Sequence, residues 1–97
     1  MVGMRAIEIH FQEHFAGEPV EVRINNRKVA AFAATTRYQI GLAHIEKVEI
    51  DDGDQVTVVV AGQTIRVPLA DDVDVYVVRL ADGIPSIEPA RGPIGYA

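Results

Sequence analysis

Hydrophobic and polar residues alternate along much of this chain with a period of two, which is the pattern of a strand with one buried face. Near the N-terminus Ile7, Ile9 and Phe11 alternate with Glu8, His10 and Gln12, which we expect to form a solvated strand face. The chain is predicted to form seven or eight short strands, drawn from residues 5–12, 20–24, 27–32, 47–50, 56–61, 64–69, 75–80 and 84–87.

The strongest strand signal lies in residues 56–69. β-Branched residues fill both arms, and Gly62-Gln63 lies between them, which favours a hairpin with a type II′ turn. Val58 and Val60 face one side of the predicted sheet and Val59 faces the other, so the first arm is apolar on both faces. We expect this strand to lie centrally, with both of its faces covered.

Turn residues separate the other predicted strands. Asn25-Asn26 favours a type I′ turn, because asparagine tolerates the positive φ angles that this turn requires. Asp82-Gly83 suits a tight turn before the last strand. Pro68 is expected to end a strand or to lie on a sheet edge.

The segment 33–46 carries a mixed pattern. Tyr38, Leu42 and Ile45 fall at helical spacing, whereas Gly41 lowers helix propensity. We expect a long connection that contains either one helical turn near residues 38–46 or a short strand.

These elements predict one all-β domain over residues 1–88, built as an antiparallel β-sandwich with an immunoglobulin-like or prealbumin-like arrangement. A chain of 97 residues is long enough for one core and too short for two. Residues 89–97 contain several prolines and glycines, so we expect them to form an extended C-terminal arm.

The rhythm of turns and strands in residues 17–29 (GEPVEVRINNRKV) and 48–58 (VEIDDGDQVTV) resembles transthyretin-like and immunoglobulin-like sandwich modules of bacteria. The resemblance covers about 50 residues and rests on this rhythm alone. It implies a binding or spacer unit more often than an enzyme, and it assigns a role to no individual residue.

Composition and charge exclude several classes of function. The net charge is −5, and the nine Lys and Arg residues are scattered, so we expect no nucleic acid or membrane partner. The chain has no cysteine, which excludes disulfides and thiolate chemistry. The N-terminus carries no secretory signal, so we expect a cytoplasmic protein, with a module of an exported protein as the alternative.

Two acidic turns are predicted to lie at the same end of the domain. One precedes the first arm of the 56–69 hairpin and the other follows its second arm. Their six carboxylates could hold calcium, which prefers six to eight oxygen ligands. The alternative, which we favour, is that they are ordinary solvated turns. The residues concerned are Asp51, Asp52, Asp54, Asp71, Asp72 and Asp74.

The long connection and the C-terminal arm are further candidate sites. Arg37, Tyr38 and His44 could bind a ligand, because guanidinium and aromatic groups pair with anions and stack on sugars or peptides. The alternative is that this segment covers the open edge of the core. Ile94 and Tyr96 could place the arm along a sheet edge as an interface, or the arm could be a frayed tail.

The sequence offers little support for catalysis or for a cofactor. Ser86, the only serine, lacks a nucleophile elbow, and no phosphate-binding glycine loop is present. His10 and His14 are four residues apart, which on a strand separates them by about 13 Å, too far for one metal ion unless the chain bends near Gln12.

We therefore expect a non-enzymatic interaction or assembly module. Its partner is another protein or a second copy of this chain, bound through an exposed edge, the 35–44 connection or the arm. The first alternative is a sandwich that binds a carbohydrate, another small molecule or calcium. The second is a small enzyme that uses His10, His14 or His44.

Overall fold

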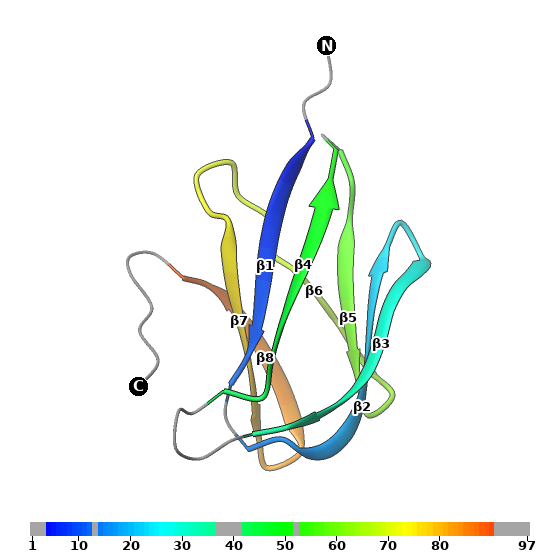
Figure 1. The fold of residues 1–97 in the computed structure, drawn as a ribbon, viewed down its shortest axis with the longest axis vertical. Helices are drawn as coiled ribbons and strands as arrows, with labels where there is room; N and C mark the ends of the chain where they lie inside the picture. Colours follow the sequence, from blue (N-terminus) through cyan, green and yellow to red (C-terminus); the bar gives the residue numbers. More distant parts are fainter. Residues whose placement is uncertain (1–3, 13, 37–41, 52, 91–97) are drawn as a thin grey trace.

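The computed structural model describes residues 4–12, 14–36, 42–51 and 53–90 and consists of strands and connecting turns (Figure 1). No helix is present in this part of the chain, and hence none that is long and apolar enough to cross a membrane. The strands are β1 (Arg5–Phe11), β2 (Ala16–Ile24), β3 (Arg27–Thr35), β4 (His44–Ile50), β5 (Val56–Val60), β6 (Gln63–Arg66), β7 (Val75–Ala81) and β8 (Ile84–Pro89).

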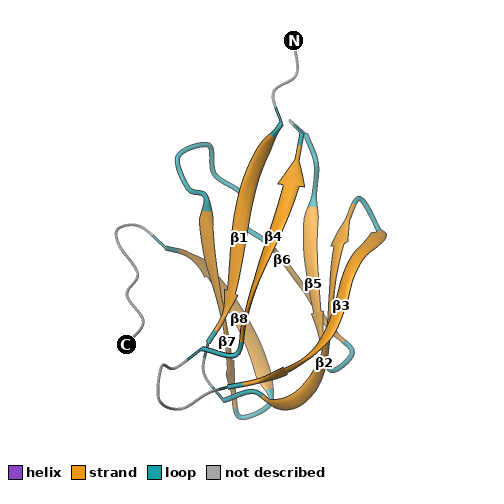
Figure 2. Cartoon of the chain, in the orientation of Figure 1, coloured by secondary structure: helices purple, strands orange, loops and turns teal. Residues whose placement is uncertain are grey.

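The strands form two four-stranded sheets that pack face to face as a β-sandwich (Figure 2). Sheet A has the order β4-β1-β7-β8 and sheet B the order β3-β2-β5-β6. All neighbours are antiparallel except β1 and β7, which are parallel. The constant-type immunoglobulin domain places its first, second, fourth and fifth strands in one sheet, so the strand order here is different.

The core lies between the two sheets and is built from the alternating apolar residues of the central strands. Ile7, Ile9 and Phe11 of β1 are fully buried, and β2 and β5 contribute alternate valines to the same core. Phe11 makes edge-to-face contacts with Phe15 and Phe32, at ring-centroid distances of 5.9 and 5.2 Å. Burial of each of these large apolar side chains stabilises the fold by about 1.5–3 kcal/mol relative to leaving it exposed to water.

All three hairpins formed by the described strands close with two consecutive residues at positive φ, as a type I′ turn requires. Asn25-Asn26 closes the β2–β3 hairpin and Asp82-Gly83 closes the β7–β8 hairpin, which confirms both predicted turns. The β5–β6 turn is formed by Ala61 (φ 47°) and Gly62 (φ 82°). The predicted type II′ turn at Gly62-Gln63 is therefore wrong by one residue, because Val60 pairs with Gln63.

The segment 33–46 is more extended than the helical spacing suggested. β3 continues to Thr35. β4 begins at His44, which pairs with Phe11, and the antiparallel pairing runs from there to Arg5 and Ile50. Of the two predicted alternatives, the short strand is therefore confirmed for residues 44–46, which belong to β4, while residues 37–41 lie outside the described residues. Backbone pairing with β1 overrides the weak helical periodicity of this segment.

The outer faces of both sheets also differ from the predictions. His10 on the outer face of sheet A is only 6% exposed, and its neighbour across the sheet, Val77, is 4% exposed. The predicted solvated face is therefore wrong at His10. In sheet B, β5 lies between β2 and β6 as predicted, but Thr57 and Val59 are half-buried, so its outer face is not fully covered.

Candidate functional site

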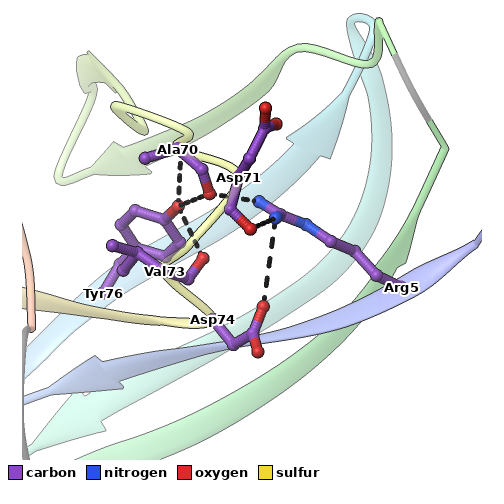
Figure 3. Close-up of polar contacts among 6 residues, drawn as sticks. All are labelled: Arg5, Ala70, Asp71, Val73, Asp74 and Tyr76. Carbon is purple, nitrogen blue, oxygen red and sulfur yellow. Dashed lines mark hydrogen bonds and ion pairs between the residues drawn. The ribbon is translucent and has the colours of Figure 1, made fainter.

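Arg5, the first residue of β1, lies against the second acidic turn (Figure 3), and Asp51 and Asp54 of the first acidic turn line the same pocket as Arg5. The Arg5 guanidinium donates a hydrogen bond from Nη1 to the carbonyl of Asp71 (2.9 Å) and one from Nη2 to the carbonyl of Ala70 (2.8 Å). Nη1 also lies 4.0 Å from Oδ1 of Asp74. Arg5, Asp51, Asp54 and Asp71 line a pocket of about 140 Å³ at this end of the sandwich. A cationic side chain thus already lies among the carboxylates.

Tyr76 anchors the β6–β7 connection behind Arg5 (Figure 3). Its ring is fully buried, and its hydroxyl donates to the carbonyl of Val73 (3.0 Å) and accepts from the amide of Ala70 (2.9 Å). A tyrosine near the start of a strand that bonds back to the preceding backbone is the arrangement called a tyrosine corner. The loop that Arg5 binds from outside is therefore held from inside by Tyr76.

The first acidic turn is fixed to the β2–β3 hairpin. The amide of Asp51 donates to Oδ2 of Asp54 (2.8 Å), and Nδ2 of Asn25 donates to Oδ1 of Asp54 (2.8 Å). These bonds favour the ionised carboxylate and lower the pKa of Asp54 below its ordinary value of 3.8. Asn25 also accepts from the amide of Gln55 (3.0 Å).

No group of three or more His, Cys, Asp or Glu side chains is arranged to hold a metal ion among the residues that the structure describes. Asp52 lies outside those residues, and Asp72 is exposed in the second turn. Of the predicted calcium ligands, Asp51, Asp54 and Asp71 share the pocket with Arg5, and Asp74 faces the same guanidinium. In this geometry the positive charge beside the carboxylates is the Arg5 guanidinium, which suits the site better than a bound calcium ion.

His44 is the described member of the ligand site that we predicted in the long connection. Its ring stacks on Phe32 of β3 at a centroid distance of 3.9 Å, and its Nε2 lies 2.9 Å from Oε1 of Glu46. The other two members, Arg37 and Tyr38, lie outside the described residues. His44 therefore connects the edge strands of the two sheets, because β3 belongs to sheet B and β4 to sheet A.

The remaining sequence candidates are dispersed. His10 lies in β1 with its Nε2 2.8 Å from Oε1 of Glu8. His14 lies in the bend before β2 and lines a separate surface pocket with Glu18 and Asp82. Ser86 is exposed on β8. Ile94 and Tyr96 of the C-terminal arm lie outside the described residues, while β8 extends to Pro89 and the amide of Ala90 donates to Val75 (2.8 Å).

The four edge strands differ sharply in how well they are protected. β8 carries two prolines, β6 is only four residues long, and β4 carries the charged residues Glu46, Lys47 and Glu49. β3 is nine residues long, and its residues 29–34 contain neither charge nor proline. Among the described strands β3 pairs only with β2. β3 has a bulge at Val29 and the basic pair Arg27-Lys28 at its start, but its residues 30–34 form a regular edge segment without charge, proline or bulge, the usual devices that prevent strand addition.

A groove runs along the seam between β3 and β4. Its apolar lining comes from Met4, Ile24, Val29 and Val48, and its volume is about 350 Å³. Val29 is 42% exposed, which is high for a valine in a strand. Charged residues of both signs surround the apolar lining, namely Arg27, Glu46, Lys47 and Glu49.

A scan against protein-family models and searches of curated proteins and of solved structures found no match to this chain.

Two features of the site were missed from the sequence. Arg5 is a lone basic residue at a strand start, and its position among the acidic turns follows only from the sheet order. The open β3 edge had a signal in the sequence, because the uncharged stretch 29–34 follows the basic pair Arg27-Lys28. That signal could not show which strands lie at edges.

Proposed function

We propose that this protein is a non-enzymatic interaction module that binds an extended strand of a protein partner along the open edge of β3. The observation that carries this proposal is the nine-residue β3, whose residues 29–34 lack charge and proline while the other three edges are short, charged or proline-containing. Strand addition to an open sheet edge is a common mode of peptide recognition. A transthyretin-like relationship and a cytoplasmic location remain predictions of the sequence.

The backbone direction along β3 supports this mode of binding. The carbonyl of Pro19 in β2 accepts from the amide of Ala61, so the Pro19 carbonyl points towards β5. Backbone direction alternates along a strand, so Val20 directs its groups towards its β3 partner Phe32. By the same alternation Ala31 and Ala33 direct their amides and carbonyls away from β2, where an added strand would bind them.

Two labelled peptides test this proposal, one with the sequence of residues 27–35 and one of alternating threonine and valine. We expect at least one to bind the full chain in a fluorescence titration. Ala31→Pro removes an amide that faces the open edge, so it should fold normally and weaken binding at least about tenfold. The measurement is the dissociation constant, with the melting temperature of each variant as a check on folding.

Thr64→Pro is the matched control. Thr64 lies on β6, the opposite edge of the same sheet, and by the same alternation its amide points away from β5 to the open side. Binding that is lost in Ala31→Pro and retained in Thr64→Pro supports the β3 edge. Equal binding by both variants, or binding of neither peptide by the unaltered chain, contradicts the proposal.

A further inference from the structure

We propose that the strand added to β3 is β3 of a second copy of this chain, antiparallel and centred on Phe32. This inference rests on the proposed function and names the partner that the β3 edge accepts. The result is a two-fold dimer in which two copies of sheet B form one continuous sheet. Such an isologous contact is the commonest form of homo-oligomer.

The register follows from the regular part of β3. Residues 30–34 pair with β2 without interruption. The register then shifts, because Val22 pairs with Ala30 but the next residue of β2, Arg23, pairs with Lys28. Val29 is the extra residue at this bulge, and a bulge bends its strand and disrupts pairing. An added strand should therefore pair along residues 30–34, whose centre is Phe32.

Centring on Phe32 also satisfies the backbone geometry. In an antiparallel pair, opposite residues share a face, and hydrogen-bonded pairs alternate with non-hydrogen-bonded pairs. With Phe32 at the axis, Ala31 of one copy lies opposite Ala33 of the other, and both direct their backbone groups to the open side. The two Phe32 residues then form a non-hydrogen-bonded pair, in which side chains lie closer together, with Cα atoms about 4.5 Å apart.

The side chains of this segment are complementary to themselves. Opposite residues in the proposed ladder are Ala30 with Ala34, Ala31 with Ala33, and Phe32 with Phe32, so no charge faces a like charge. Directly opposed aromatic residues stabilise a sheet by roughly 0.2–1 kcal/mol relative to alanine. Phe32 is only half-buried in the single chain although it packs on Phe11 and His44. The dimer covers its remaining exposed surface.

The basic pair at the start of β3 lies outside this ladder. Arg27 and Lys28 precede the bulge, so they leave the uncharged segment free to pair. Each copy carries a net charge of −5, which opposes association at low ionic strength. The ladder is short, so we expect a weak dimer that forms with increasing concentration and is strengthened by salt.

Solution mass and directed disulfides test this inference on the full chain. Sedimentation equilibrium from about 10 μM to about 1 mM should show a monomer–dimer equilibrium, in the range of small transient interfaces. The chain contains no cysteine, so each introduced thiol is unique. An equimolar mixture of Ala31→Cys and Ala33→Cys, distinguishable by a tag, should oxidise mainly to the mixed dimer, because hydrogen-bonded partners have Cα atoms about 5.5 Å apart.

Each alternative result has a distinct meaning. Preferential oxidation of Ala31→Cys or of Ala33→Cys with itself would overturn the Phe32 register in favour of an axis at that residue. Thr64→Cys is the control on the opposite edge, and equal cross-linking of this variant would overturn the role of β3 in the dimer. A monomer at all concentrations would overturn the second copy as partner, whereas peptide binding that depends on Ala31 would still support the proposed function.

Discussion

Single residues hold the acidic end of this sandwich, and Tyr76 is the most constrained of them. Its hydroxyl bonds both the Val73 carbonyl and the Ala70 amide in a buried position. Tyr76→Phe keeps the ring but leaves these backbone groups without the hydroxyl. We expect the free energy of unfolding to fall by about 1–3 kcal/mol, the cost of leaving buried polar groups unsatisfied. Urea denaturation measures this change.

Hydrogen exchange identifies the origin of the effect. In Tyr76→Phe the amide of Ala70 should exchange faster than in the unaltered chain, while the amide of Val67, which donates to the carbonyl of Val56 (2.9 Å), should lose protection only as global stability falls. A loss of stability without faster exchange at Ala70 would contradict the anchoring role.

Arg5 holds the same connection from the solvent side. Arg5→Met keeps the aliphatic stem but removes both charge-assisted bonds to the Ala70 and Asp71 carbonyls. Because the side chain is 30% exposed, water replaces part of what is lost, and we expect about 1 kcal/mol of destabilisation. Arg66→Met on exposed β6 is the control and should change the free energy of unfolding by less than about 0.5 kcal/mol. Equal losses of unfolding free energy in Arg5→Met and Arg66→Met would contradict the role of Arg5 in holding this connection.

At the scale of elements, the β5–β6 hairpin carries a correctable strain. Ala61 adopts a φ of 47° at the first position of a type I′ turn, where asparagine is preferred. Left-handed backbone costs alanine roughly 1 kcal/mol, so Ala61→Asn should raise the free energy of unfolding by about 0.5–1 kcal/mol. Thermal denaturation followed by circular dichroism measures the gain.

Ala81→Asn serves as the control for this hairpin. Ala81 immediately precedes the turn residues of the β7–β8 hairpin and is not among the residues at positive φ. The same side-chain change there should give no stabilisation. A similar gain at both positions would indicate an effect of asparagine unrelated to the turn.

The elements themselves were largely predictable, because strand alternation and turn residues are local signals. Asn25-Asn26 and Asp82-Gly83 closed the hairpins as expected, and the all-β sandwich followed. Errors arose where tertiary pairing decided the outcome. The β5–β6 turn moved by one residue because the pairing of Val60 with Gln63 left Ala61 in the turn, and β4 began at His44 because it pairs with β1.

The candidate site was less predictable than the elements, for a physical reason. The sequence showed that two acidic turns flank one hairpin, and this was enough to place them at one end. It did not show that Arg5 lines a pocket with them, because that depends on β1 pairing with β4 and β7 across the sheet. Edge strands are likewise a property of the whole sheet order, so the role of β3 followed only from the complete topology.

At the scale of the whole molecule, the stability of the fold should depend on acid through Asp54. The Asp51 amide and then the Asn25 carboxamide lower its pKa in the folded chain. A carboxyl group with a lowered folded pKa stabilises the fold at pH values above its unfolded pKa, and this contribution is lost as the pH falls through the folded value. The unaltered chain should therefore lose stability from about pH 5 downwards.

Asp54→Asn removes this dependence. The variant should be less stable than the unaltered chain at pH 7, and the two melting temperatures should converge as the pH falls below the folded pKa of Asp54. Asn25→Gly keeps the positive φ of Asn25 (51°) but removes its donor to Asp54 and its acceptor for the Gln55 amide, so the variant should be less stable at pH 7 and its melting temperature should show an intermediate acid dependence. Glu21, whose pKa is lowered by the Arg23 guanidinium, acts in the same direction, so Glu21→Gln should reduce part of the remaining slope. Melting curves from pH 7 to pH 2.5 test this, and parallel curves for the unaltered chain and Asp54→Asn would contradict the coupling of Asp54 to folding.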